Sequence, residues 1–119
     1  MKEFMYVFRR ELATNGSAPA PSPEQMQQGM KAWQDWLAGL SAKNRMAATG
    51  KRLHDEGRVL RANKVVTDGP YVELKEGVGG YMFVRAQDID EAVELAKGCP
   101  IFAMGGSLEV RPVFDIPNS

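Results

Sequence analysis

The sequence has 119 residues, of which 44% are hydrophobic and 25% charged, values that are ordinary for a single globular domain and opposed to disorder. Fifteen basic and fifteen acidic residues give a formal net charge of +0, and like charges are not grouped into blocks. Because nucleic-acid binders and polybasic membrane anchors concentrate positive charge, this balance argues against both classes of protein.

The first predicted element is a β-strand over residues 4–8, a short apolar run that is rich in aromatic side chains. Both alternating sets of side chains in this run are apolar, so both faces of the strand need to be covered. Residues 11–21 follow as a connector that contains glycine and proline and has no periodicity.

A helix is predicted to begin at residues 22–25. Ser22 can cap it, Pro23 suits the first helical position, and Gln25 can complete a capping box. Apolar residues then recur at spacings of three and four, which defines one helical face: Met26, Met30, Trp33, Leu37 and Leu40. The helix is predicted to end within residues 40–42.

The middle of the chain has weaker signals. Residues 45–53 are assigned to a second strand because of their position. Two short extended pieces, 58–61 and 64–67, flank a turn at Ala62 and Asn63. The sequence Asp-Gly-Pro at residues 68–70 then ends this excursion, because proline cannot donate to a strand ladder.

The last third of the chain predicts a strand, a helix and a strand. Residues 81–85 are apolar on both faces, and the two glycines before them indicate a bulge or a close backbone approach. An Asp-x-x-Glu start at residues 88–91 predicts a helix that ends before Gly98 and Pro100. The residues expected on its buried stripe are Ile89, Ala92, Val93 and Ala96. Residues 107–113 alternate, with Leu108 and Val110 on one side.

The order of these elements is β-α-β, an excursion, and again β-α-β. It predicts one α+β domain over residues 1–119, a ferredoxin-like βαββαβ sandwich with a four-stranded antiparallel sheet and two helices on one face. Two helices cover one face of such a sheet, yet its strands are apolar on both faces. Since soluble monomers rarely leave so large an apolar patch in water, we expect two sheets to pack face to face in a homodimer.

Polar residues on the first and last strands form one candidate binding site. Glu109 and Arg111 are two apart on the last strand and therefore point the same way, and Arg9 ends the first strand. Arg9 and Arg111 are candidate anchors for an anionic ligand, because a guanidinium can bind a carboxylate through two hydrogen bonds. The alternative is an ion pair on an exposed strand face.

Asp68 and Trp36 are two further candidates. Asp68, held in a Gly-Pro turn, is the candidate catalytic residue as a general base, and the alternative is a turn residue that bonds its own backbone. Trp36 lies beside the main stripe of the first helix and is a candidate wall for a flat ligand, whereas Trp33 is assigned to the core.

The stretch VVTDGPYVELKE at residues 65–76, followed by Gly79, Gly80 and Tyr81, closely resembles the hallmark of the DGPF branch of the YCII-related family. That hallmark is an Asp-Gly-Pro-Phe turn, an acid, a Lys-Glu pair and a Gly-Gly-aromatic strand entry. Tyr71 stands where phenylalanine is usual. The Ser-Pro-Glu-Gln helix start and residues 106–112 fit the same pattern, so the resemblance extends over most of the chain.

The resemblance implies a cytoplasmic homodimer of the dimeric ferredoxin-like α+β barrel type, without a bound cofactor, and with a cleft at the sheet and the Asp-Gly-Pro turn. Tyr71, Lys75 and Tyr81, around that turn, are then candidate ligand contacts. A cytoplasmic location also agrees with the lack of an apolar leader or a long apolar run. The single cysteine, Cys99, is assigned a structural role, and a metal site is not indicated.

Two functions fit these observations. One is a cofactor-independent enzyme that acts on a small carboxylate or lactone, with Asp68 as its base. The other is a non-catalytic ligand-sensing or regulatory dimer associated with transcription control. The substitution Asp68→Asn separates them, because an enzyme would keep its ligand affinity and lose turnover, whereas a binding module would change in affinity alone.

Overall fold

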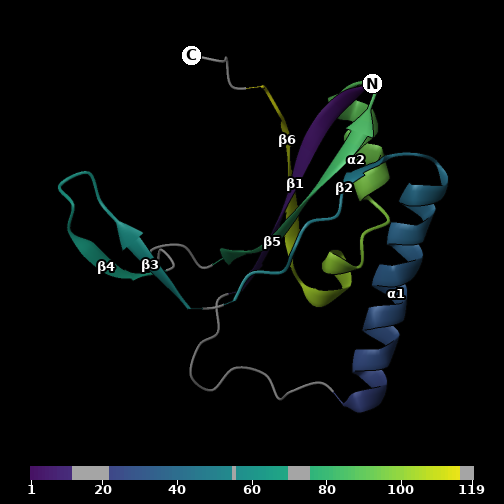
Figure 1. Ribbon diagram of the computed structural model, residues 1–119. Helices are drawn as coiled ribbons and strands as arrows, with labels where there is room; N and C mark the ends of the chain where they lie inside the picture. Colours follow the sequence, from purple (N-terminus) through teal and green to yellow (C-terminus); the bar gives the residue numbers. More distant parts are fainter. Residues whose placement is uncertain (12–21, 55, 70–75, 116–119) are drawn as a thin grey trace.

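The structure, a computed structural model, describes residues 1–11, 22–54, 56–69 and 76–115. Along the chain (Figure 1) the elements are β1 (Lys2–Glu11), α1 (Pro23–Ala42), β2 (Met46–Ala48), β3 (Gly57–Leu60), β4 (Val66–Gly69), β5 (Glu76–Ala86), α2 (Ile89–Ala96), the 3-10 helix η1 (Pro100–Met104) and β6 (Ser107–Pro112). The expected strands and helices are confirmed, with β1 and β5 longer and β2 shorter than expected. The helix η1 was not expected.

Four strands form an antiparallel sheet in the order β2-β5-β1-β6. Helices α1 and α2 lie on the same side of it (Figure 1). The mixed α+β class is therefore confirmed, and the arrangement is compatible with a ferredoxin-like fold. Residues 22–25 form the predicted capping box, since the Ser22 hydroxyl accepts from the Gln25 backbone and the Gln25 side chain accepts from the Ser22 backbone.

The core lies between the sheet and the two helices. On β1 the alternate residues Phe4, Tyr6 and Phe8 are buried, and the register places Phe4 opposite Val84 and Tyr6 opposite Met82. Helix α1 covers them with Leu40 and its tryptophans, while α2 contributes two buried alanines. Burial of these aromatic rings contributes to the apolar contact that stabilises the fold.

The opposite face of the sheet, here called the open face, also carries apolar side chains. Met5 lies opposite Phe83, and Val7 lies opposite Tyr81, and all four are half-buried. Neither α1 nor α2 covers this face (Figure 1). The prediction that β1 and β5 are apolar on both sides is confirmed, and the register shows which residues share each side.

Two predicted stripes are buried only in part. On α1, Met26 and Met30 are 56% and 62% exposed, because the first turns of this helix extend past the sheet (Figure 1). On α2 the helix turns its alanines to the core, so that Ile89 and Val93 remain largely exposed. The spacing identified the helices correctly and overestimated how far each apolar face is covered.

Strands β3 and β4 form a separate two-stranded sheet, the hairpin arm, which projects from the body of the molecule (Figure 1). Its residues Leu60, Val65 and Val66 are more than half exposed. An isolated two-stranded hairpin is marginally stable in water, because few side chains pack against it.

Hydrogen exchange is therefore expected to be fast in the hairpin arm and slow in β1 and β5. The amides of residues 57–60 should exchange at nearly unprotected rates, whereas those of residues 4–8 should open only with the whole domain. Mass spectrometry of peptic fragments measures both regions in one sample. Equal protection in the arm and in β1 would contradict this assignment.

Candidate functional site

A close approach of two backbone segments shapes one end of the sheet. The segment 50–53 runs beside β5, where Leu53 N–H donates to Gly79 O at 2.8 Å and Tyr81 N–H donates to Lys51 O at 3.1 Å. A Cβ atom at Gly50 would lie 1.3 Å from Tyr81 O, so only glycine fits there. The β1–β5 register also shifts between Phe8 and Arg9, opposite Gly79. The bulge or close approach expected at the paired glycines is confirmed.

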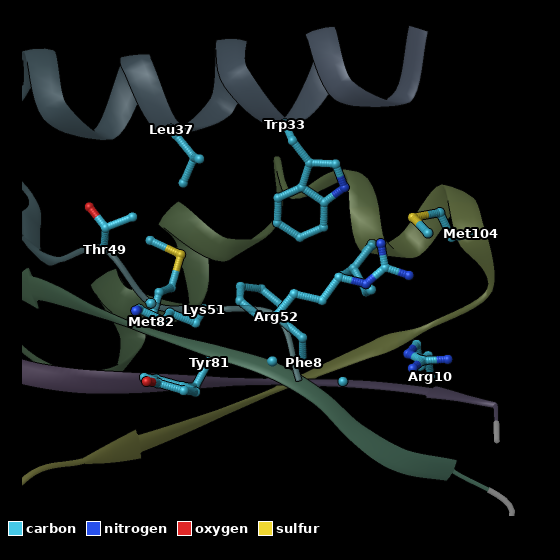
Figure 2. A pocket seen from close by; sticks show the side chains of 14 residues that line it. Phe8, Arg10, Trp33, Leu37, Thr49, Lys51, Arg52, Tyr81, Met82 and Met104 are labelled. Carbon is cyan, nitrogen blue, oxygen red and sulfur yellow. The ribbon is translucent and has the colours of Figure 1, made fainter. Parts of the chain in front are cut away.

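A cavity of about 240 Å³ lies between α1, this bulged part of β5 and the segment 50–53 (Figure 2). Its apolar lining comes from four elements and consists of Phe8, Trp33, Leu37, Met82, Ile101 and Met104. The Trp33 ring meets Phe8 edge to face, with centroids 5.3 Å apart. A largely apolar, concave site of this kind suits a small organic ligand.

The charged side chains around the cavity all carry positive charge: Arg10, Lys51 and Arg52. The fourteen lining residues that the structure describes include no Asp, Glu, His or Cys. In Figure 2, Arg10 and Arg52 lie toward the end marked by Met104, and Lys51 lies toward Met82. The described lining therefore combines apolar side chains with positively charged ones.

The predicted cluster of Arg9, Glu109 and Arg111 does assemble, on the open face and not at the cavity. Arg9 donates from Nε and Nη2 to Glu109 Oε1, at 3.2 and 2.9 Å, and Arg111 Nη1 lies 3.7 Å from Glu109 Oε2. The Arg9 side chain is 30% and the Glu109 side chain 38% exposed. The arrangement corresponds to the ion pair that was the alternative reading, and a ligand role stays a prediction.

Both tryptophans pack against the core, as was expected of Trp33, and the role of Trp36 as a ligand wall stays a prediction. Trp36 stacks on Tyr6 with centroids 6.1 Å apart, and its Nε1–H donates to Leu95 O at 3.1 Å, which ties α1 to α2. Trp33, assigned to the core from the sequence, lines the cavity. Tyr81 borders the cavity as well, while its ring lies on the open face (Figure 2). The spacing of apolar residues on α1 indicates which of its faces is buried. It does not indicate where the sheet beneath the helix ends.

The remaining candidates lie at the edge of the described chain. The backbone of Asp68 belongs to β4, opposite Arg58, and its side chain lies outside the described part. Tyr71 and Lys75 lie outside the described residues altogether. Their roles stay predictions.

Among the residues that the structure describes, no group of three His, Cys, Asp or Glu side chains is suitably placed for a metal ion.

Cys99 has the structural role assigned to it. It is buried, and its Sγ accepts from Ile101 N–H at 3.5 Å, so that the thiol caps η1. Burial raises the pKa of this thiol to about 11, and the hydrogen bond from Ile101 partly opposes that rise. A thiol that is protonated at neutral pH is a poor nucleophile.

Cys99 is therefore expected to react with an aromatic disulfide reagent at least about a hundredfold more slowly at pH 8 in the native protein than in urea. The same protein with Cys99→Ser and Ser41→Cys places a thiol on an exposed part of α1 and serves as the control. Equal rates for native and unfolded Cys99 would contradict its burial.

Taken together, the chain is an α+β domain whose helices and sheet enclose a small apolar cavity with cationic side chains. The family model of the YCII-related domain matches residues 5–117, and the chain therefore belongs to that family. The match runs from β1 to beyond β6 and so includes every residue that lines the cavity. No curated protein matches the sequence.

In the described residues, neither helix combines the length and apolar character that crossing a membrane requires.

Proposed function

We propose that this protein, as a member of the DGPF branch of its family, binds a small organic molecule in the cavity between α1 and β5. The observation that carries the proposal is the cavity itself. Its apolar side chains come from α1, β1, β5 and η1, and one of its walls depends on the backbone approach at Gly50. Side chains normally fill a protein interior, whereas the backbone at this wall leaves a space unfilled.

The lining residues favour binding or sensing over catalysis. General acid–base chemistry uses His, Asp, Glu or Cys in most enzymes, and the fourteen described lining residues contain none of these. The backbone of Asp68, the candidate base, belongs to β4 in the hairpin arm. We therefore rank the ligand-sensing module above the enzyme that acts on a carboxylate or lactone.

We also propose that the protein works as a homodimer in which two open faces pack together. The support is the half-buried set of Met5, Val7, Tyr81 and Phe83, which α1 and α2 leave uncovered. A twofold axis through this face brings apolar side chains of both copies into contact. The cavity lies on the other side of the sheet and stays accessible in each subunit.

A thermal-shift screen with small carboxylic acids, amides, alcohols and lactones tests the binding proposal. A ligand at a hundred times its Kd is expected to stabilise the protein by about 2.7 kcal/mol and so raise its Tm. The variant Leu37→Trp, which fills the cavity, should lose this shift, whereas Met30→Trp on the exposed part of the same helix should keep it. The proposal fails if no compound shifts the Tm, or if Leu37→Trp responds as the wild type does.

A further inference from the structure

We infer that the cavity selects organic anions, namely molecules with a compact apolar body and a carboxylate that is bound at the end near Arg10 and Arg52. This inference rests on the proposed function, because it specifies the chemistry of the ligand in the same cavity. It adds the charge of the ligand, its orientation and the residues that recognise it.

Three cations, Arg10, Lys51 and Arg52, line the cavity, and its lining within the described residues includes no carboxylate. The half-buried Arg9 and Arg45 lie beside Glu109 and Glu91, whereas Lys51 and Arg52 are exposed. Within the described residues, neither Lys51 nor Arg52 forms a side-chain ion pair. A carboxylate on the ligand would be attracted by these cations, and a guanidinium can bind it through charge-assisted hydrogen bonds.

The positions of the cations indicate how the ligand is oriented in the cavity. Figure 2 shows Arg10 and Arg52 toward one end of the cavity, near Met104, and Lys51 toward the other. A guanidinium donates two parallel hydrogen bonds to a carboxylate, whereas a lysine ammonium acts as a single point of charge. The arginine end is therefore the site for the carboxylate, and Lys51 contributes a weaker, longer-range attraction.

The cavity has a volume of about 240 Å³, which limits the body of the ligand. Trp33 and Phe8 contribute aromatic surface, and Met104 contributes a flexible thioether that adapts to different shapes. A single aromatic ring or a short acyl chain with one carboxylate fits this space, and a nucleotide is too large for it.

The test uses pairs of ligands that share one body and differ in charge, such as benzoate with benzamide and octanoate with octanamide. Isothermal titration calorimetry at low and at physiological salt measures both members of each pair. Each acid is expected to bind at least about tenfold more tightly than its amide, as charge-assisted hydrogen bonds imply, and added salt should reduce this preference.

Variants show whether the assigned residues carry the preference. Arg52→Met should lower the acid-to-amide affinity ratio, Lys51→Met should lower it less, and Arg61→Met, in the hairpin arm, should leave it unchanged. If Arg52→Met folds poorly, Arg52→Lys keeps the charge and should still weaken binding of the acid.

Equal affinity for acid and amide overturns this inference and leaves the proposed function standing. Binding of neither acids nor amides, together with a failed screen of alcohols and lactones, overturns both. An acid preference that Arg52→Met leaves undiminished overturns the assignment of the carboxylate to the arginine end.

Discussion

Replacing Tyr6 with alanine is expected to lower the free energy of unfolding by about 3–5 kcal/mol, the range for truncating a large buried aromatic residue. The Tyr6 side chain is fully buried on the helix-covered side of β1, and it stacks on Trp36. Its hydroxyl donates to Ala92 O at 2.5 Å and so connects the sheet to α2. Urea titration followed by circular dichroism gives the change, and a loss below about 1 kcal/mol would contradict this role.

The variant Tyr6→Phe separates the ring from the hydroxyl. Loss of the hydroxyl leaves Ala92 O without this donor and is expected to cost about 1–3 kcal/mol. Burial raises the pKa of the Tyr6 hydroxyl above its ordinary value of 10.0. The unfolded chain therefore loses this proton first, and stability falls as the pH rises above about 10. Tyr6→Phe should show a smaller alkaline loss of stability than the wild type.

A glutamate at Val7 is expected to convert the proposed homodimer into a monomer. Val7 lies opposite Tyr81 in the middle of the open face, so that a packed second copy would bury the new charges without partners. Sedimentation velocity at micromolar concentration measures the change. The wild type should have twice the mass of the 13.1 kDa chain, and Val7→Glu should have that of one chain.

The matched control is Val65→Glu, which places the same charge on the exposed hairpin arm and should leave the mass unchanged. A wild-type protein that sediments as a monomer at these concentrations would end the dimer proposal. A Val7→Glu protein that stays dimeric and folded would show that the two copies meet through another surface.

Most of the fold could be predicted from the sequence, because its signals are local. The cap at Ser22, the three-and-four spacing of α1 and the alternation in β6 each depend on a few neighbouring residues. The sides of the sheet could not be assigned in the same way. Phe4 and Phe83 belong to strands distant in sequence, and only the register places them on opposite sides.

The candidate site was harder to predict than the fold. Its lining joins Trp33 on α1, Lys51 and Arg52 after β2, and the glycines of β5, and no periodicity relates these segments. The available signal was Gly50 directly before two cations in a stretch with a weak strand pattern. The cluster of Arg9, Glu109 and Arg111 was predictable, because two of its members follow strand alternation.

The most direct test of ligand binding in this cavity uses tryptophan fluorescence. In Trp36→Phe the only remaining tryptophan is Trp33, which lines the cavity, and in Trp33→Phe the only one is Trp36, which packs on Tyr6. A compound that raises the Tm is expected to change the emission of Trp36→Phe saturably and to leave that of Trp33→Phe nearly constant. Saturable binding with no change in Trp33 emission would contradict the proposed site.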